Sequence, residues 1–173
     1  MMVRFISNRG FTLIELIMTI VIGGVIALAV SPLLSQGFSA YFASTIQADM
    51  DSQAKLAMER MSREIRQIQD PPSQIYSMQS DRLSFFLTGV GTITYRRSTT
   101  SPNTLVRIES NDSDVLATDV SRLSFRYLDY LQNPVFDPGS VKVVEIQFAL
   151  KYNQAGGIFS RTFRSMVFLR NAT

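Results

Sequence analysis

An apolar run from Phe11 to Leu34 restricts the fold of this chain more than any other feature. It contains 24 residues, and its only charge is the carboxylate of Glu15. As a helix with a rise of about 1.5 Å per residue, the run extends for roughly 36 Å, which is enough to cross a bilayer with some tilt. Because an unpaired acid within a membrane costs at least about 2 kcal/mol, we expect Glu15 to have a function.

The charges before this run predict its orientation. Arg4 and Arg9 precede it, whereas no acidic residue does. Since Lys and Arg are retained on the cytoplasmic side, we expect a single-pass protein of the inner membrane with its N-terminus in the cytoplasm. Two other interpretations stay open at this point. A secretory signal peptide cleaved after Ala29 would release a chain that starts at Val30, and a plain signal anchor would hold a periplasmic sensor-like domain.

The composition excludes most enzyme classes. The chain has 173 residues, of which 46% are hydrophobic, and it contains neither Cys nor His. Without these side chains it cannot form a disulfide, the common zinc sites or a Ser-His-Asp triad. A net charge of +3 gives no electrostatic case for nucleic-acid binding. We therefore expect a protein that is not an enzyme and that needs no cofactor or metal.

The segment GFTLIEL at positions 10–16 follows the basic leader directly. It resembles the cleavage and methylation signature of type IV prepilins and type II secretion pseudopilins, and the resemblance covers about the first 35 residues. It implies that a prepilin peptidase cuts between Gly10 and Phe11 and methylates the new amine of Phe11. It also implies that Glu15 pairs with that amine on a neighbouring subunit during assembly. An ion pair in a low dielectric is far stronger than one in water, which agrees with this role.

A local interpretation of the same acid also stays open. Thr12 and Glu15 have the spacing of a capping box, and an acid near a helix N-terminus is favourable in any case. Further along the run, Gly23, Gly24 and Pro32 lower helix stability. In pilins, such residues mark a stretch that loosens when subunits pack into a filament, although Gly and Pro are also common in membrane helices generally.

From Phe38 to Gln69 the helical period continues, but the segment becomes amphipathic. Apolar residues at steps of three and four predict one buried face, formed by Phe42, Ile46, Met50, Ala54, Met58, Met61, Ile65 and Ile68. Residues of alternating sign at i,i+4 spacing predict a charged face, formed by Asp51, Lys55, Glu59 and Arg63. Pro71 and Pro72 are expected to end this helix.

After Ser73, short apolar or alternating runs separated by turn residues predict strands. These are Ile75 to Gln79, Arg82 to Leu87, Thr92 to Arg96, Thr104 to Glu109, Arg122 to Tyr130, Val141 to Lys151 and Ile158 to Arg170. Gly89 and Gly91 indicate a hairpin turn, and loops are expected at 111–114, 133–140 and 153–157. The expected fold is α+β and type IV pilin-like, with a long N-terminal helix packed on an antiparallel sheet. Its segments are a leader (1–10), a transmembrane or filament-core helix (11–35), its amphipathic continuation (36–70) and a β-rich domain (73–173).

The globular domain offers only weak candidate sites. Arg96 and Arg97, beside Tyr95, could contact DNA, but two arginines at a strand end usually discourage aggregation. The oxygens of the sequence NDSD at 111–114 lack the spacing of a dedicated calcium loop. Nucleic-acid and calcium binding are therefore not expected.

The resemblance also implies partners and a type of subunit. The partners are the prepilin peptidase, the inner-membrane assembly platform and other pilins or pseudopilins in a periplasmic or extracellular filament. Many major pilins carry a C-terminal disulfide loop, which a chain without Cys cannot form. The C-terminal strand pattern is similar to minor pilins of the pilin W and pseudopilin J group, and to minor subunits of mannose-sensitive haemagglutinin pili. The expected function is therefore that of a minor pilin that acts in filament initiation or at the tip. The alternatives are a minor pseudopilin of type II secretion and a DNA-uptake or adhesive pilin.

Overall fold

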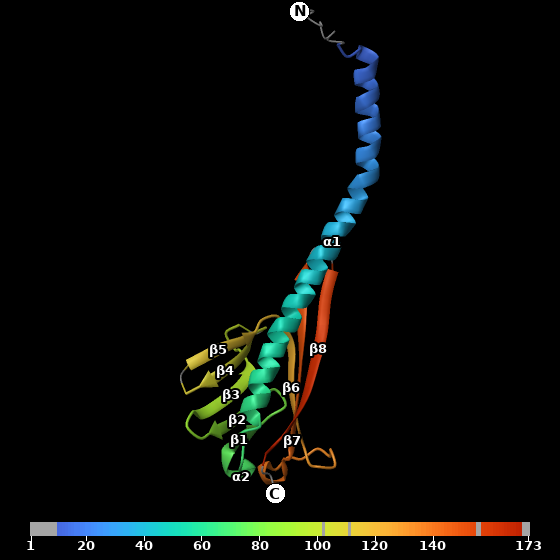
Figure 1. Cartoon of the computed structure of the whole chain (residues 1–173). Coiled ribbons are helices and arrows are strands. Elements are labelled where there is room, and N and C mark those ends of the chain that lie inside the picture. The colour runs from blue at the N-terminus through green and yellow to red at the C-terminus, as the bar shows by residue number, and fades with distance from the viewer. Residues whose placement is uncertain (1–9, 102, 111, 155–156, 171–173) are drawn as a thin grey trace, which may run out of the picture. The chain divides into compact units, whose positions relative to one another are not determined.

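The computed structural model describes residues 10–101, 103–110, 112–154 and 157–170. The predicted leader lies outside these residues except for Gly10, as do Arg4, Arg9 and Asn111. A long helix, α1 (Leu13–Ile65), is followed by antiparallel strands (Figure 1), which confirms the expected α+β, type IV pilin-like architecture. The chain forms two compact units, residues 1–45 and 46–173, and α1 runs through both.

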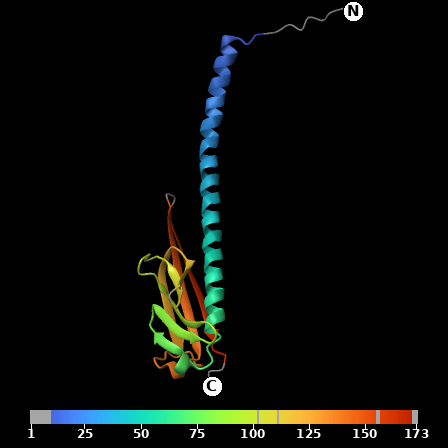
Figure 2. The same ribbon diagram turned by 90° about the vertical axis from the view of Figure 1, so that its left-hand side faces the viewer.

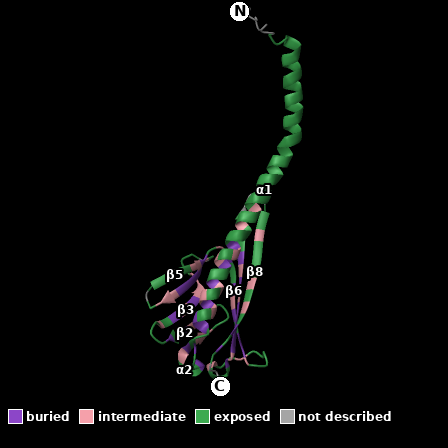
Figure 3. Ribbon diagram, in the orientation of Figure 1, coloured by how far each residue is buried: buried purple, intermediate pink, exposed green. Residues whose placement is uncertain are grey.

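The first unit consists of the apolar half of α1. Its large hydrophobic side chains from Phe11 to Phe42 are between 40% and 86% exposed. Figure 3 shows this half of the helix as exposed along its whole length. α1 also continues through Pro32 without a break.

The second unit joins the last turns of α1 to two antiparallel sheets. The five-stranded sheet follows chain order and contains β1 (Ile75–Met78), β2 (Arg82–Leu87), β3 (Gly91–Arg97), β4 (Leu105–Glu109) and β5 (Asp112–Ala117). The three-stranded sheet has the order β6-β7-β8 and contains β6 (Val120–Leu128), β7 (Val143–Gln154) and β8 (Gly157–Phe168). Two short helices, α2 (Pro71–Gln74) and η1 (Pro138–Ser140), lie in the connections.

Three local expectations are wrong. α1 ends at Ile65, before the prolines, and Pro71 instead begins α2, because a proline fits the first turn of a helix. Asp112–Ala117 was expected to begin as a loop but is strand β5, paired with β4. The strands also form two sheets and not one, because β5 and β6 do not pair with each other.

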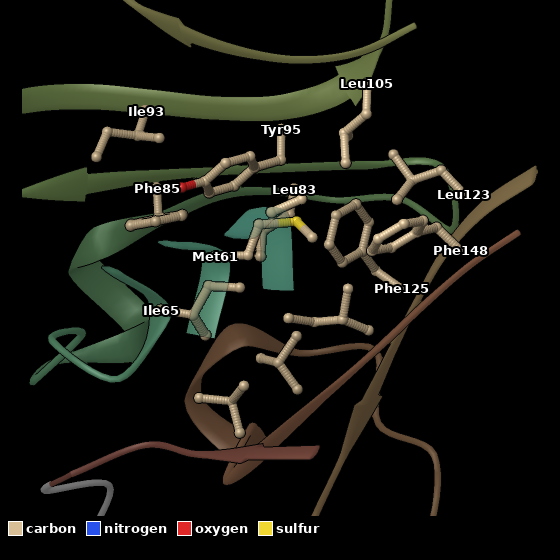
Figure 4. Packing of buried hydrophobic residues seen from close by; sticks show 14 of the residues in the cluster. Met61, Ile65, Leu83, Phe85, Ile93, Tyr95, Leu105, Leu123, Phe125 and Phe148 are labelled. Atoms are coloured by element: carbon tan, nitrogen blue, oxygen red, sulfur yellow. The ribbon is translucent and has the colours of Figure 1, made fainter. Parts of the chain in front are cut away.

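The core lies between the amphipathic part of α1 and the two sheets. Met61 and Ile65 face aromatic side chains from both sheets, among them Phe85, Tyr95 and Phe148 (Figure 4). The predicted apolar stripe of the helix is largely confirmed: Met50, Ala54, Met61, Ile65 and Ile68 are buried, Ile46 and Met58 pack against the core, and Phe42 is exposed.

The hairpin between β2 and β3 confirms the predicted turn. Gly89 and Gly91 have φ values of +85° and +111°, a left-handed conformation that favours glycine. This turn sets the register of the hairpin, in which Phe85 lies opposite Ile93. The register therefore directs Leu83 and Phe85 of β2 and Ile93 and Tyr95 of β3 to the same buried face.

Candidate functional site

The described chain begins with a helix N-cap built from the motif residues. The carboxylate of Glu15 accepts hydrogen bonds from the backbone N–H of Thr12 at 3.1 Å and from its hydroxyl at 3.2 Å. In return, the N–H of Glu15 donates to the Thr12 hydroxyl oxygen at 3.4 Å. This reciprocal arrangement is a capping box. The first N–H groups of an isolated helix are thereby satisfied within the chain itself.

The predicted scissile bond lies just outside this cap. Gly10 and Phe11 precede the first helical residue, Leu13, and both are exposed, with Phe11 86% exposed. Since the bond is not part of the helix, a peptidase can reach it without unwinding α1. The Glu15 carboxylate is hydrogen-bonded at Thr12, the residue next to the predicted N-terminal amine. A new amine on Phe11 would therefore form close to a carboxylate.

The helix that follows this cap matches the length and composition of a membrane span. It is one long apolar helix near the N-terminus, and none of its most apolar 18-residue window is buried within the described chain. Between Arg9 and Asp49, only Glu15 carries a charge. An unburied apolar surface of this extent is stable only when lipid or other apolar helices surround it.

Comparison with known families supports the same interpretation. Residues 6–31 match the model described as the prokaryotic N-terminal methylation motif. The match covers the end of the predicted leader, the Gly10–Phe11 bond and most of the apolar run. It supports a type IV pilin-like or prepilin family and indicates a pilin-like or pseudopilin precursor that is processed by prepilin peptidase and assembled with other pilins. The search of curated proteins gave no match for this chain.

The glycine and proline positions of the apolar helix have no role that the isolated chain explains. Apart from the adjacent residues and the nearby helix backbone, no atom lies within 4 Å of the point where a Cβ would sit on Gly23 or Gly24. At Pro32 the regular hydrogen bond to the carbonyl of Leu28 cannot form, because proline has no N–H. These residues thus weaken the helix without any packing requirement in the single chain.

The structure does not bring the two candidate DNA-contacting arginines together. Consecutive residues of a strand face opposite sides, so Arg96 and Arg97 lie on different faces of β3. Arg97 donates to the backbone oxygen of Ser121 at 3.2 Å and so links the two sheets. The neighbouring aromatic ring, Tyr95, is fully buried and cannot stack on a base. Among the described residues, no group of three or more acidic side chains is arranged to hold a metal.

Sequence reasoning missed a buried ionic cluster that joins α1 to the five-stranded sheet. Glu64 of α1 and Arg107 of β4 are 8% and 4% exposed, and the Arg107 Nε donates to Glu64 Oε2 at 3.0 Å. The Tyr95 hydroxyl donates to the same carboxylate oxygen. The other end of the Arg107 guanidinium donates to Glu109 at 2.6 Å. Arg60 completes the cluster by pairing with Asp114 at 2.8 Å.

The environment of this cluster fixes its protonation. Burial, followed by the hydrogen bond to Glu64, raises the pKa of Tyr95, so its phenol remains a hydrogen-bond donor. Burial alone would lower the pKa of Arg107, but the hydrogen bonds to Glu64 and Glu109 raise it above its usual value. Arg107 is therefore a permanent buried cation whose main partner comes from the helix.

The charged face expected on α1 is used differently from the prediction. Among the described side chains, Asp51, Lys55, Glu59 and Arg63 form no i,i+4 ion pairs with one another. Asp51 instead pairs with Arg161 of β8 at 2.6 Å. This long-range pair joins the helix to the three-stranded sheet.

Proposed function

We propose that this chain is a minor pilin. It is made as a precursor, cut by prepilin peptidase between Gly10 and Phe11, and methylated on Phe11. The mature subunit waits in the inner membrane with its N-terminus in the cytoplasm, and the assembly platform then moves it into a type IV pilus or pseudopilus. Its function is assembly, at filament initiation or at the tip, and not chemistry.

The observation that carries this proposal is an apolar helix with a single carboxylate located at its N-cap. In the unprocessed chain, Thr12 satisfies that carboxylate. Cleavage adds a cation at Phe11, and an ion pair in a low dielectric is much stronger than a neutral hydrogen bond. Glu15 can then exchange its own cap for the amine of a neighbouring subunit, which sets the register of docking.

In this proposal, Gly23, Gly24 and Pro32 loosen the helix during packing into the filament. The lack of close neighbours at both glycines in the single chain supports the idea that they act only in an assembly. The absence of cysteine supports a minor rather than a major subunit, because the disulfide loop of many major pilins cannot form.

Intact-mass measurement tests the processing step. Co-expression of the full chain with a prepilin peptidase should give a mature protein that starts at N-methylated Phe11. A protein that keeps Met1 would indicate a plain signal anchor, and one that starts at Val30 would indicate ordinary secretion. Either result would refute the proposal.

Two substitutions of Glu15 separate its cap from its charge. Glu15→Gln keeps a capping-box acceptor but removes the charge, whereas Glu15→Leu removes both. If the charge directs docking, both variants should be cleaved normally and both should be lost from sheared filaments. Normal incorporation of Glu15→Gln together with loss of Glu15→Leu would show that only the helix cap matters.

A further inference from the structure

Strand β8 forms a long edge of the second unit. It has 12 residues and pairs only with β7 among the described strands, so its other side is free. Most of its side chains are exposed, in contrast to the buried side chains of β7. A free edge presents unpaired N–H and C=O groups that can accept another strand.

The free edge of β8 borders a seam with α1. The two elements run side by side (Figure 2), joined by the Asp51–Arg161 ion pair and by the Ser62 and Ser165 hydroxyls at 3.5 Å. A hollow of about 430 Å³ lies at one end, between Met50 and residues 158–161. A second hollow, of about 580 Å³, lies at the other end, between the last turns of α1 and Arg170. The seam is thus open at both ends.

The second hollow of this seam is positively charged. Arg63 of α1, Arg66 just after α1 and Arg170 after β8 line it, and the only acid in its lining is Glu59. Within the described part of the chain, none of these three arginines has an ion-pair partner. β8 and the two residues after it contain three arginines and no acid.

We propose that the seam binds an extended, acidic segment of a partner protein, which adds to β8 as a further strand. Backbone hydrogen bonds to the edge provide affinity for any strand, and alternate side chains provide selectivity. Residues opposite Arg161, Phe163 and Ser165 would face α1, because these three share the inner face of the sheet. Acids on this face toward the C-terminal end of β8 meet Arg63, Arg66 and Arg170, which line the second hollow. The inference goes beyond the proposed function, since it does not require cleavage at Gly10.

The same charges disfavour a second copy of this chain as the occupant. In a two-fold antiparallel pairing of β8 with itself centred on Thr162, Arg161 lies opposite Phe163 of the other copy and diagonally across from its Arg161. Long side chains reach each other across such a diagonal, so these like charges disfavour the pairing. An acidic strand turns the same positions into attractions.

The test uses the full chain in non-ionic detergent and two labelled peptides as long as β8. In one peptide Glu alternates with Val, and in the other Lys replaces every Glu. Fluorescence anisotropy should show binding of the Glu peptide only. In hydrogen exchange, the bound peptide should protect amides of β8 and not those of β5, an edge strand of the other sheet.

A matched pair of variants locates the site. Arg66→Glu with Arg170→Glu should weaken binding of the Glu peptide about tenfold, because each reversal replaces an attraction with a repulsion. Arg82→Glu with Arg122→Glu changes the net charge equally at exposed positions away from the seam, and should change affinity less than twofold. Equal weakening by both pairs, protection of β5 in place of β8, or tighter binding of single-stranded DNA than of the Glu peptide would overturn the proposal.

Discussion

Removing the carboxylate of Glu64 should destabilise the second unit strongly. In Glu64→Leu, the buried guanidinium of Arg107 loses its nearest partner on α1, and the Tyr95 hydroxyl loses its acceptor. Breaking a buried ion pair from one side costs about 3–5 kcal/mol. Glu109 at 2.6 Å and Asp114 at 3.8 Å still face the guanidinium, so we expect the lower end of this range, about 3 kcal/mol.

A triple variant separates the charge effect from the packing effect. Glu64→Leu with Tyr95→Phe and Arg107→Met replaces the three buried polar groups with apolar side chains of comparable size. Replacement of a whole buried ion pair is often close to neutral, so the triple variant should be within about 1 kcal/mol of the original chain. Its recovery relative to Glu64→Leu is the essential result.

Urea unfolding of the full chain in non-ionic detergent, followed by near-ultraviolet circular dichroism, measures both effects. The signal comes from tyrosines, because the chain has six Tyr and no Trp. A loss below about 1 kcal/mol in Glu64→Leu would show that the cluster does not hold the helix to the sheet. A triple variant as unstable as the single variant would show that packing of these side chains, and not an orphaned charge, is responsible.

Three further predictions concern single sites. Hydrogen bonds, chiefly from the backbone N–H of Asn133, lower the pKa of Asp129 below its ordinary value of 3.8. These bonds therefore stabilise the loop fully above pH 3.8, and the stabilisation is lost as the pH falls through the lowered pKa of the folded state. An NMR titration of the Asn133 amide should give a midpoint below 3.8, and a midpoint at or above 3.8 would contradict the arrangement. Gly89→Ala should cost about 1–2 kcal/mol in urea unfolding, because φ is +85° there, and an unchanged midpoint would be evidence against that turn. Thr12→Val should cost the helix N-terminus about 1 kcal/mol, seen as faster exchange of the Glu15 amide; unchanged exchange would mean that the cap is not formed in solution.

The sequence predicted the strands of the second unit well, with one informative exception. The hairpin from Arg82 to Arg97 follows from alternation and from the glycines between its strands. β5 was missed because Asp112 and Asp114 favour turns when considered alone. Asp114 is tolerated in the strand because Arg60 and Arg107 neutralise it, and this information comes from other elements.

The sequence did contain a signal for the buried cluster. Glu64 lies three residues after Met61 and seven after Ala57, so its spacing places it within the buried stripe of α1. Arg107 alternates with Leu105 on the inner face of β4. A carboxylate and a guanidinium on two apolar faces that pack together must find partners. Assigning every charge to a solvent-exposed face hid this pair.

The N-terminal segment is determined almost entirely by local sequence. The length of the apolar run, the capping residues Thr12 and Glu15, and the methylation motif all lie within a few turns of one helix, so short-range chemistry is sufficient to find them. Tertiary structure decided which charges are buried and which edge is free. Glu64 and Arg107 are 43 residues apart in sequence, and β8 became an edge only through the order in which strands paired. The burial of this ion pair and the edge position of β8 both depend on long-range packing. For the ion pair, that packing sets the cost of removing the two charges from water against the energy of their attraction.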